Sequence, residues 1–575
     1  MIKLLKGLKP FSLSIIIILI FTFLRTLTEL FLPTLMSDIV DIGIVKQDIG
    51  YIAKTGAFML LIAALGGLCS ILTSMLSAKT GSAFARNLRN KVFEKIENYS
   101  LKEFDEKGTA SLITRTTNDI TQIQNLVVML LRMFIRAPLM AIGGIIMAIN
   151  KNPNLSLIII VVVVILGIVI GLVASKSIPM FKSMQVKVDK LNLVLRERLT
   201  GIRVIRAFNK INHEKKRFND ANKDLTNTAI KVNKLMACLT PILMLLFNFT
   251  TIFIIWFGSF KINNGAMQVG DLMAFIQYVS QIMFSLIMLT MIFILIPRAS
   301  ASAIRINEVL NVEPEINDPN DPADKTEKRG YIEFKNVSFR YNNAEGEALE
   351  DISFQAEPGE VTAIIGGTGS GKSTLVNLIS RFYDVSRGSI LIDDVDIRKM
   401  SQEYLRSKIG LVPQKAVLFS GTITQNIRFG KEDANKEEIV HACEIAQATE
   451  FINDMKDGYD SEISQGGTNI SGGQKQRLSI ARALVRKPEI YIFDDSFSAL
   501  DFKTDARLRQ ALKKETLNDT VIIVAQRVTT VMNADRIIVL DEGRIVGMGT
   551  HKELLSSSDV YRQIVSSQLS EEELA

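Results

Sequence analysis

Long apolar segments dominate the first half of the chain, and they constrain its fold more than any other feature. Six segments come close to the ~20 apolar residues that a helix needs to cross a bilayer. They lie at residues 11–35, 53–78, 125–149, 154–175, 236–260 and 269–297. In the second half, strands and helices alternate. The sequence therefore predicts an N-terminal all-α domain of six transmembrane helices, fused to a C-terminal soluble α/β domain.

Composition also predicts where the domains begin and end. At 575 residues the chain is too long for one compact domain. A polar, proline-containing stretch separates the apolar half from the soluble half. We expect a transmembrane domain at 1–315, a linker at 316–330, a soluble domain at 331–566 and a solvated tail at 567–575.

Basic residues concentrate in the long connections between the apolar segments. Residues 176–234 contain fifteen Lys or Arg and five Asp or Glu, whereas the short connection 38–54 is acidic on balance. This asymmetry follows the positive-inside rule, so we place both termini, the long connections and the soluble domain in the cytoplasm. It also accounts for the net charge of +7, which therefore does not indicate a nucleic-acid partner.

Four charged residues fall within the predicted membrane helices. Arg25 and Glu29 lie four residues apart, which puts them on one helix face, and Arg132 and Arg136 repeat that spacing. Charge inside a bilayer is costly and by default marks an interior functional surface. Two interpretations stay open. The residues line such a surface, or Arg25 and Glu29 only neutralise each other while the two arginines sit at the headgroup boundary.

The long inner connections, at about 79–124 and 176–235, carry helical periodicity through charged stretches. We expect these helices to continue beyond the bilayer, an arrangement that suits the transmission of motion between the soluble domain and the membrane. We predict two contact points with the soluble domain, at residues 109–119 and 200–212. The second has the pattern of a short amphipathic helix, which could fit a groove.

The strongest motif of the soluble half is GGTGSGKS at residues 366–373, which fits the pattern G-x-x-x-x-G-K-S. An apolar strand at 361–365 precedes it and a helix at 374–382 follows. The glycines let backbone N–H groups converge on phosphate oxygens, and the helix N-terminus favours negative charge. Lys372 is expected to neutralise the β- and γ-phosphates of ATP, and Ser373 to supply an oxygen to Mg²⁺. The predicted ATP-binding residues of this loop are Gly366, Gly367, Thr368, Gly369, Ser370, Gly371, Lys372, Ser373 and Thr374.

A second phosphate-binding feature lies about 100 residues further along the chain. Residues 470–474, ISGGQ, open a helix, so the Ser471 hydroxyl and the glycine N–H groups form an anion site at a helix start. The apolar strand 491–493 then ends in Asp494, which is expected to hold Mg²⁺ through water. One chain with two phosphate-binding helix starts implies that two such domains face each other around shared nucleotides.

These motifs stand in the order that is typical of ABC transporter nucleotide-binding domains, which the soluble half resembles. They are the phosphate loop, Gln414 in VPQ, ISGGQ, Asp494, and Asp501 in SALD. With six preceding spans, almost the whole chain resembles a half-size ABC exporter of a bacterial inner or plasma membrane. The resemblance implies two chains that sandwich two ATP molecules, each between the phosphate loop of one chain and the signature helix of the other.

The same resemblance implies roles for further residues. Tyr341 would stack on adenine, Gln414 would sense Mg²⁺ and water, and Asp501 would lie at the subunit seam. The signature residues that would complete the site of the partner are Ser471, Gly472, Gly473 and Gln474. The residues that would contact Mg²⁺ are Ser373, Gln414 and Asp494.

Two residues depart from the family pattern at the positions that carry the chemistry. Asp495 stands where the family has a glutamate that activates water, and Gln526 where it has a histidine facing the γ-phosphate. Aspartate is one methylene shorter, and a misplacement of about 1 Å can cost about a hundredfold in rate. Glutamine can donate a hydrogen bond but cannot carry a positive charge. Together the two changes resemble the degenerate chain of heterodimeric, multidrug-type bacterial ABC exporters.

The predicted function is that of one subunit of a heterodimeric ABC exporter that binds ATP and Mg²⁺ and spans the lipid bilayer. Its partner would be a second half-transporter chain with a competent catalytic site, where most hydrolysis occurs. The substrates expected from the resemblance are small hydrophobic or amphipathic compounds, drug-like or lipid-like. The alternatives are a homodimer with slow hydrolysis, an ATP-gated channel or signalling module, and an importer on the same scaffold.

Overall fold

The computed structural model describes residues 1–342 and 344–568, so most of the predicted tail lies outside the described residues. The side chains of Ile2, residues 290–295 and Pro297 are also outside the description. The chain divides into two compact units. The first comprises Met1–Glu97 and Gly108–Val312, and the second comprises Asn98–Lys107 and the chain from Glu313 onward.

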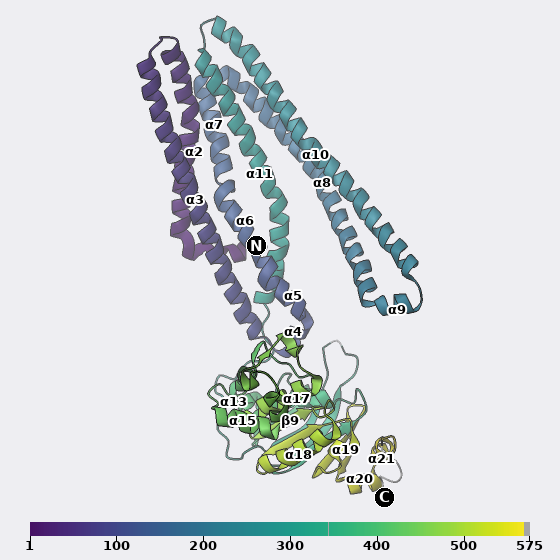
Figure 1. Ribbon diagram of the computed structural model, residues 1–575. Helices are drawn as coiled ribbons and strands as arrows, with labels where there is room; N and C mark the ends of the chain where they lie inside the picture. The colour runs from purple at the N-terminus through teal and green to yellow at the C-terminus, as the bar shows by residue number, and fades with distance from the viewer. Residues whose placement is uncertain (343, 569–575) are drawn as a thin grey trace. The chain divides into compact units, whose positions relative to one another are not determined.

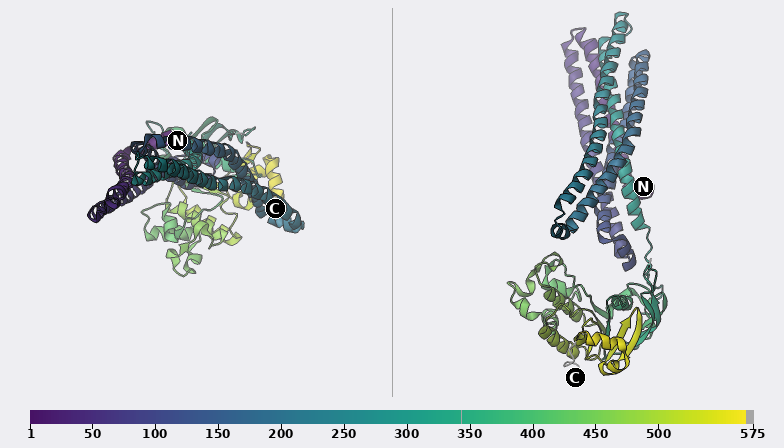
Figure 2. Two further views of the ribbon diagram at one scale, coloured as in Figure 1. Left: turned by 90° about the horizontal axis from the view of Figure 1, so that it is seen from above. Right: turned by 90° about the vertical axis from the view of Figure 1, so that its right-hand side faces the viewer.

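The first unit is entirely helical (Figures 1 and 2). Within the described residues, six helical stretches are long and apolar enough to cross a membrane, which confirms the six predicted spans. Helix α2 packs on α3, α8 on α10, and α7 on α11. The main helices are α2 (Ser12–Asp38), α3 (Ile49–Glu97), α6 (Ile120–Met129), α7 (Arg136–Lys151), α8 (Pro153–Thr200), α10 (Ile211–Asn263) and α11 (Val269–Leu310). The shorter ones are α1 (Ile2–Leu5), α5 (Thr109–Thr114) and α9 (Ile202–Ala207).

Three of these helices are much longer than a bilayer requires. Helices α3, α8 and α10 have 49, 48 and 53 residues, which at 1.5 Å per residue corresponds to about 70–80 Å, against a hydrocarbon core of about 30 Å. Large apolar side chains also point outward. Leu157, Val161 and Trp256 are 60%, 57% and 62% exposed, as expected of helices whose solvent is lipid.

The third span is interrupted twice by π-helical turns. One turn, η3 (Arg115–Asp119), joins α5 to α6, and the other, η4 (Leu130–Phe134), joins α6 to α7. Such turns insert one extra residue per turn and often occur at functional sites. Neither the polar sequence of η3 nor the mainly apolar sequence of η4 predicted a π turn.

The second unit is an α/β domain built on a mostly parallel six-stranded sheet in the order β12-β11-β3-β10-β9-β6, in which only β12 is antiparallel. A smaller antiparallel sheet has the order β2-β1-β4-β5. The strands of the large sheet are β3 (Val361–Gly366), β6 (Ile409–Val412), β9 (Ile490–Asp494), β10 (Thr520–Val524), β11 (Arg536–Asp541) and β12 (Arg544–Gly549). Those of the small sheets are β1 (Ile332–Phe339), β2 (Leu349–Ala356), β4 (Arg387–Ile392), β5 (Val395–Asp396), β7 (Gly421–Thr422) and β8 (Glu462–Ile463). The two architectures confirm the predicted fold class.

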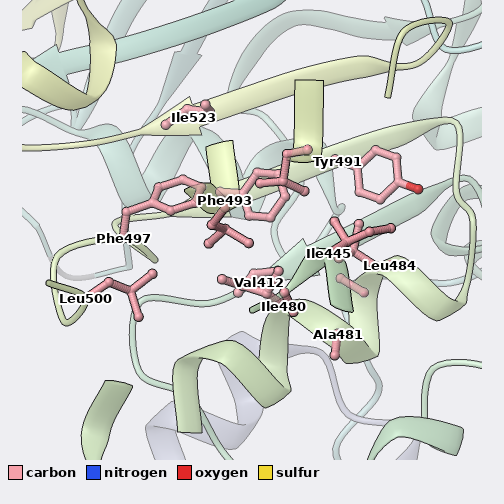
Figure 3. Close-up of a cluster of buried hydrophobic side chains, with 14 of the residues drawn as sticks. Val412, Ile445, Ile480, Ala481, Leu484, Tyr491, Phe493, Phe497, Leu500 and Ile523 are labelled. Atoms are coloured by element: carbon pink, nitrogen blue, oxygen red, sulfur yellow. The ribbon is translucent and has the colours of Figure 1, made fainter. Parts of the chain in front are cut away.

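Helices cover both faces of the large sheet. On one face Phe493 and Tyr491 of β9 pack with Ile480 and Leu484 of α17 (Gly472–Val485) (Figure 3). On the other face Leu375 of α12 packs with the sheet. Strands buried on both faces read as continuous apolar runs, which is why the sequence revealed them. The helices of this unit are α4 (Leu101–Lys107), α12 (Lys372–Ile379), α13 (Gln402–Ser407), α14 (Ile423–Arg428), α15 (Lys436–Ile445), α16 (Thr449–Asn453), α17, α18 (Phe502–Glu515), α19 (Val528–Val531), α20 (His551–Ser557) and α21 (Asp559–Ser566).

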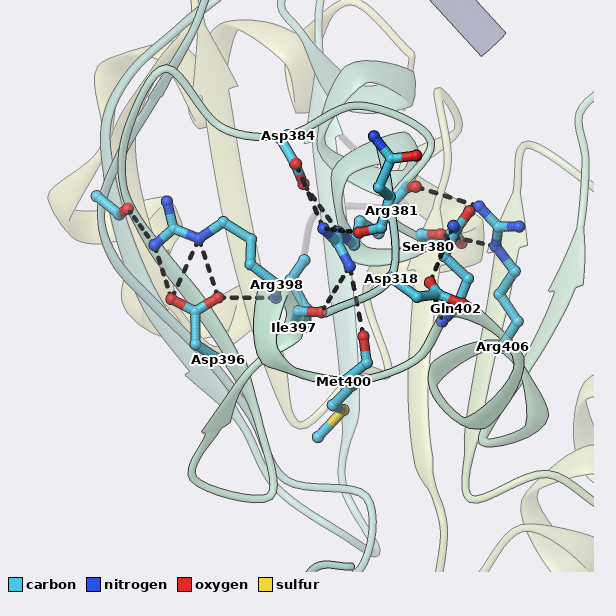
Figure 4. Close-up of polar contacts among 12 residues, drawn as sticks. Asp318, Ser380, Arg381, Asp384, Asp396, Ile397, Arg398, Met400, Gln402 and Arg406 are labelled. Carbon is cyan, nitrogen blue, oxygen red and sulfur yellow. Dashed lines mark hydrogen bonds and ion pairs between the residues drawn. The ribbon is translucent and has the colours of Figure 1, made fainter. Parts of the chain in front are cut away.

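The predicted linker lies along the surface of the α/β domain. The backbone carbonyl of Asn317 accepts from the buried Arg381 guanidinium at 3.4 Å, and the Asp318 carboxylate accepts from the Gln402 backbone and side-chain nitrogens, both at 3.0 Å (Figure 4). The Asp324 carboxylate accepts two hydrogen bonds from Ser401, one from its backbone N at 3.0 Å and one from its Oγ at 2.7 Å. Asp318 and Asp324 of the predicted linker are therefore hydrogen-bond acceptors for the α/β domain.

Candidate nucleotide site

Three parallel strands bring the candidate residues to one edge of the sheet. Strand β10 lies between β3 and β9, and Val524 is in register with both Ile364 and Asp494. The residues that follow these three strands therefore meet, since the carboxyl ends of parallel strands share an edge. In open α/β sheets, ligands bind beyond such an edge.

The loop between β3 and α12 requires glycine at defined positions. Gly369 and Gly371 have φ values of +84° and +99°, a region that side chains disfavour. A Cβ on Gly371 would lie 2.9 Å from the Ala348 carbonyl oxygen, and one on Gly366 would lie 2.2 Å from the Leu540 carbonyl oxygen. The loop thus keeps its backbone close to β2 and β11 and leads directly into the N-terminus of α12, which begins two residues earlier and ends three residues earlier than predicted.

Lys372 folds back over this loop. Its Nζ donates to the carbonyl oxygens of Gly366 at 3.0 Å and Gly367 at 2.6 Å. Burial lowers the pKa of Lys372, while the carboxylates of Asp495 and Asp494 act in the opposite direction. Phosphate oxygens would be stronger acceptors for this ammonium group than neutral carbonyls, because charge-assisted hydrogen bonds are about twice as strong.

Ser373 and Asp494 form an oxygen pair that suits Mg²⁺. The Ser373 hydroxyl donates to Asp494 Oδ1 at 3.3 Å, and burial raises the pKa of Asp494 while that hydrogen bond lowers it. These two residues would hold Mg²⁺, Ser373 through its hydroxyl oxygen and Asp494 through water. Mg²⁺ bound here would neutralise phosphate charge.

Gln414 and Gln526 both donate to Asp495. Gln414 Nε2 lies 3.3 Å and Gln526 Nε2 3.2 Å from Asp495 Oδ2. The Mg²⁺ role of Gln414 stays a prediction. Asp495 has a φ of +45° and is half-buried. Burial raises its pKa, and the hydrogen bond from Gln414 lowers it. Gln568 in turn donates from Nε2 to the Gln526 carbonyl oxygen at 2.8 Å, a contact that no sequence motif indicated.

Tyr341 lies beside the start of α12. Its hydroxyl pairs with Thr374 Oγ1 at 3.0 Å, and its ring meets Tyr383 edge-on at a centroid distance of 5.4 Å. The Tyr383 hydroxyl donates to Asp105 of helix α4 at 2.9 Å. Tyr341, which is expected to stack on adenine, is therefore linked to α4 through the side chain of Tyr383.

Helix α4 was missed by the sequence reasoning. Its Glu106 also accepts from Asn342 Nδ2 at 3.2 Å, so residues 98–107 pack on the α/β domain. Residues 109–119, predicted to make such a contact, belong to the first unit, where Asp119 accepts from Ser302 Oγ at 2.8 Å. The run of acidic residues in LKEFDEK, between Ser100 and Gly108, was the available signal. The role of residues 200–212 stays a prediction.

The signature residues lie at an exposed helix start. Ser471 caps α17: its Oγ accepts from Gln474 N at 3.3 Å, and Gln474 Oε1 accepts from Ser471 N at 2.8 Å. A Cβ on Gly473 would lie 3.1 Å from the Ala499 carbonyl oxygen. Within residues 1–342 and 344–568, no hydrogen bond or ion pair joins Ser471 or Gln474 to the phosphate loop.

Asp501 caps the next helix, α18, by accepting from Thr504 N at 2.9 Å. That hydrogen bond lowers the pKa of Asp501, which is exposed. The neighbouring aromatic Phe502 is also exposed, at 75%. The position of Asp501 at a subunit seam stays a prediction.

Comparisons with known proteins agree with this architecture. Residues 15–286 match the family described as the ABC transporter transmembrane region, and residues 349–498 match the family described as ABC transporter. The ABC transporter ATP-binding protein YfiB of Bacillus subtilis is 42% identical over 570 residues, covering 99% of each chain. The ABC transporter ATP-binding protein MT1311 of Mycobacterium tuberculosis is 41% identical, covering 98% of this chain and 97% of its own.

A solved structure has the same fold along its whole length. It is a bacterial Atm1-family ABC exporter with ATP bound, which has a TM-score of 0.81 and 27% identity and covers 98% of this chain and 99% of its own. The six membrane-spanning helices and the nucleotide-binding α/β domain thus occur together as one exporter fold.

Proposed function

Since this chain belongs to the ABC transporter family and has the exporter fold, we propose that it is the subunit of a heterodimeric exporter whose own ATP site is impaired. The protein is an integral membrane protein with an ATPase domain, and exporters of this fold work as pairs of such chains. In this complex most ATP is hydrolysed at the site of the partner subunit.

The observation that carries the proposal is the hydrogen bond between the two departing residues. Gln526 Nε2 donates to Asp495 Oδ2 at 3.2 Å, and Gln414 donates to the same oxygen. A general base must reach the proton that it removes. Asp495 is one methylene shorter than glutamate, and one of its oxygens is already held by two amides. It is therefore a poor acceptor for a proton from an attacking water.

The residues expected to bind ATP, by contrast, show no departure from the family pattern. Lys372 would exchange its carbonyl partners for phosphate oxygens, Ser373 and Asp494 would hold Mg²⁺, and Tyr341 would stack on adenine beside Thr374. Ser471 and Gln474 would complete the site of the partner subunit. Tight binding with slow cleavage here would hold the two nucleotide domains together while the site of the partner turns over.

We place the spans in a bacterial inner or plasma membrane, and the soluble domain and both termini in the cytoplasm. This placement is based on the basic connections and on the bacterial relatives. The substrates are hydrophobic or amphipathic compounds that leave the cytoplasm. A second half-transporter chain would supply the competent catalytic acid.

The test compares the ATP hydrolysis of the full-length chain purified alone with that of the chain co-purified with its companion. We expect the pair to hydrolyse ATP at least about tenfold faster than the lone chain. A loss of about 1.4 kcal/mol of transition-state stabilisation at the impaired site would account for a tenfold difference in rate. Full turnover by the lone chain would support the homodimer instead, and passive flux down a gradient in vesicles would support a channel.

A further inference from the structure

A cavity of about 690 Å³ lies within the first unit, and its wall is basic. It is lined by parts of α2, α3, α6, η4, α7 and α11, and three arginines face it: Arg25, Arg132 and Arg136. No carboxylate is among its lining residues in the described part of the chain. A basic cavity among apolar helices is unusual, because charge in a membrane domain is expensive and is normally paired.

The neighbouring acid balances only part of this charge. Glu29 accepts from Arg25 Nε through Oε1 at 2.9 Å and from Arg136 Nη2 through Oε2 at 2.6 Å. One carboxylate therefore serves two arginines, and three guanidinium groups face one acid. The interpretation that Arg25 and Glu29 merely neutralise each other is incomplete, since the cavity keeps about two positive charges in excess.

Two of the arginines keep donors to spare. Arg132 makes no hydrogen bond or ion pair with any described residue, and Arg136 Nε is buried with no hydrogen-bond partner in the described chain. A guanidinium fork matches the geometry of carboxylate, sulfonate and phosphate oxygens. These donors are therefore suited to an anionic ligand.

The backbone supports this placement of Arg132. It lies in the π-helical turn η4, which separates α6 from α7. A π turn changes which side chains share a face, and such turns often occur at functional sites. Polar groups of Ser74 and Gln124 also line the cavity, so an anion would find neutral donors beside the arginines.

The rest of the wall is apolar and adaptable. Met129, Met133 and Met288 line the cavity together with Val128, and the unbranched thioether of methionine fits ligands of varied shape. In the proposed orientation, Gln124 and Ser74 lie toward the cytoplasmic ends of their spans. The cavity therefore combines a cationic end with an apolar wall at the inner side of the membrane domain.

We propose that this cavity binds an amphipathic anion, that is, a phosphate, sulfonate or carboxylate attached to an apolar body. It forms the half of the transport site that this chain contributes, a statement that rests on the proposed exporter function. The anion comes either from a lipid of the inner leaflet or from a soluble organic compound in the cytoplasm.

The test measures binding of tritiated decyl phosphate to the full-length chain in phosphatidylcholine nanodiscs, with empty discs as background. Decanol and decyltrimethylammonium carry the same apolar chain without the negative charge and are expected not to compete.

R132Q should weaken binding about tenfold, because a hydrogen bond to a charged group contributes about 1.5–3 kcal/mol. R132K should stay within about threefold of the wild type, because Lys keeps the positive charge as a point charge, and this separates loss of charge from misfolding. R86Q removes an exposed arginine of α3 outside the cavity and should leave the Kd unchanged.

Two competitors identify the source of the anion. Displacement by phosphatidylglycerol built into the disc supports a lipid, and displacement by a naphthalene sulfonate added in water supports a soluble compound. Displacement by neither, equal displacement by decyltrimethylammonium, or an unchanged Kd in R132Q would overturn the inference. ATP cleavage is measured separately on the wild-type chain, so fast cleavage with Arg132-dependent binding would refute the impaired site and leave this inference standing.

Discussion

Gln526 Nε2 and Asp495 Oδ2 lie 3.2 Å apart, and the same carboxylate oxygen accepts from Gln414 Nε2 at 3.3 Å. The two residues that depart from the family pattern are thus hydrogen-bonded to each other. The neutral amide of Gln526 has no positive charge to offer the γ-phosphate, and its N–H is already donated to the acid. In the proposed function, the short acid and the neutral amide therefore act as one unit that does not activate water.

The signature serine should be needed by the partner subunit and not by this chain. S471A removes the hydroxyl that would bind phosphate across the interface and also the cap of α17. We expect ATP hydrolysis by the two-chain complex to fall about tenfold or more, since a hydrogen bond to a charged group is worth about 1.5–3 kcal/mol. ATP binding by this chain, measured with a labelled analogue, should be unchanged.

The matched control is T550A, which removes the same reciprocal cap from helix α20, where Thr550 pairs with Glu553. Both variants lose about 1 kcal/mol of helix stability, but only S471A should lose hydrolysis. Equal loss in both would attribute the effect to stability alone.

Removal of the Tyr383 hydroxyl should weaken the packing of helix α4 on the α/β domain. Y383F deletes the hydroxyl that donates to Asp105 at 2.9 Å, a hydrogen bond worth about 1 kcal/mol. Amide hydrogen exchange across Leu101–Lys107 should accelerate about fivefold, the factor that corresponds to 1 kcal/mol. Y404F, which removes a hydroxyl bonded to Thr326 in the same domain, should leave the exchange of α4 as it is. Unaltered exchange in Y383F would show that the ring and not its hydroxyl holds α4.

The Asp494 carboxylate, which we propose to hold Mg²⁺, should destabilise the folded protein when Mg²⁺ and ATP are not bound. Burial raises the pKa of Asp494, and Asp495 adds to this while Ser373 and Lys372 oppose it. A carboxyl whose pKa is higher in the folded state favours folding most below its unfolded pKa, and this advantage disappears as pH rises through the folded value. D494N cannot ionise, so at pH 7 it should melt above the wild type without nucleotide.

The difference in melting temperature between D494N and the wild type should shrink as pH falls toward the ordinary aspartate pKa of about 3.9. Addition of Mg²⁺ and ATP should raise the melting temperature of the wild type much more than that of D494N. A lower melting temperature of unliganded D494N at pH 7 would contradict this account.

The sequence predicted two strands of the sheet edge well, because buried parallel strands are continuous apolar runs that stand out at 361–365 and 491–493. It also predicted the glycine-rich turn between β3 and α12, where Gly369 and Gly371 have backbone conformations that other residues disfavour. It could not show that Gln526 reaches Asp495, because that depends on the register of β10 beside β9.

Three further features were beyond the sequence for similar reasons. The π turn at Leu130–Phe134 has no signature in an apolar helix, so the sequence left open whether Arg132 lines an interior surface or sits at the headgroup boundary. The packing of α4 and of the linker depends on side chains more than 60 residues away in the chain, such as Tyr383 for Asp105 and Ser401 for Asp324. Their local sequences show only polar, acidic segments.

The most direct measurement is single-turnover ATP cleavage by the full-length chain purified alone, with the protein in excess over ATP. The account predicts that the wild type leaves bound ATP largely intact over a period in which the double variant D495E/Q526H cleaves it at least tenfold faster, up to about the hundredfold that a 1 Å misplacement costs. Equal and rapid cleavage by the wild type and the double variant would contradict it.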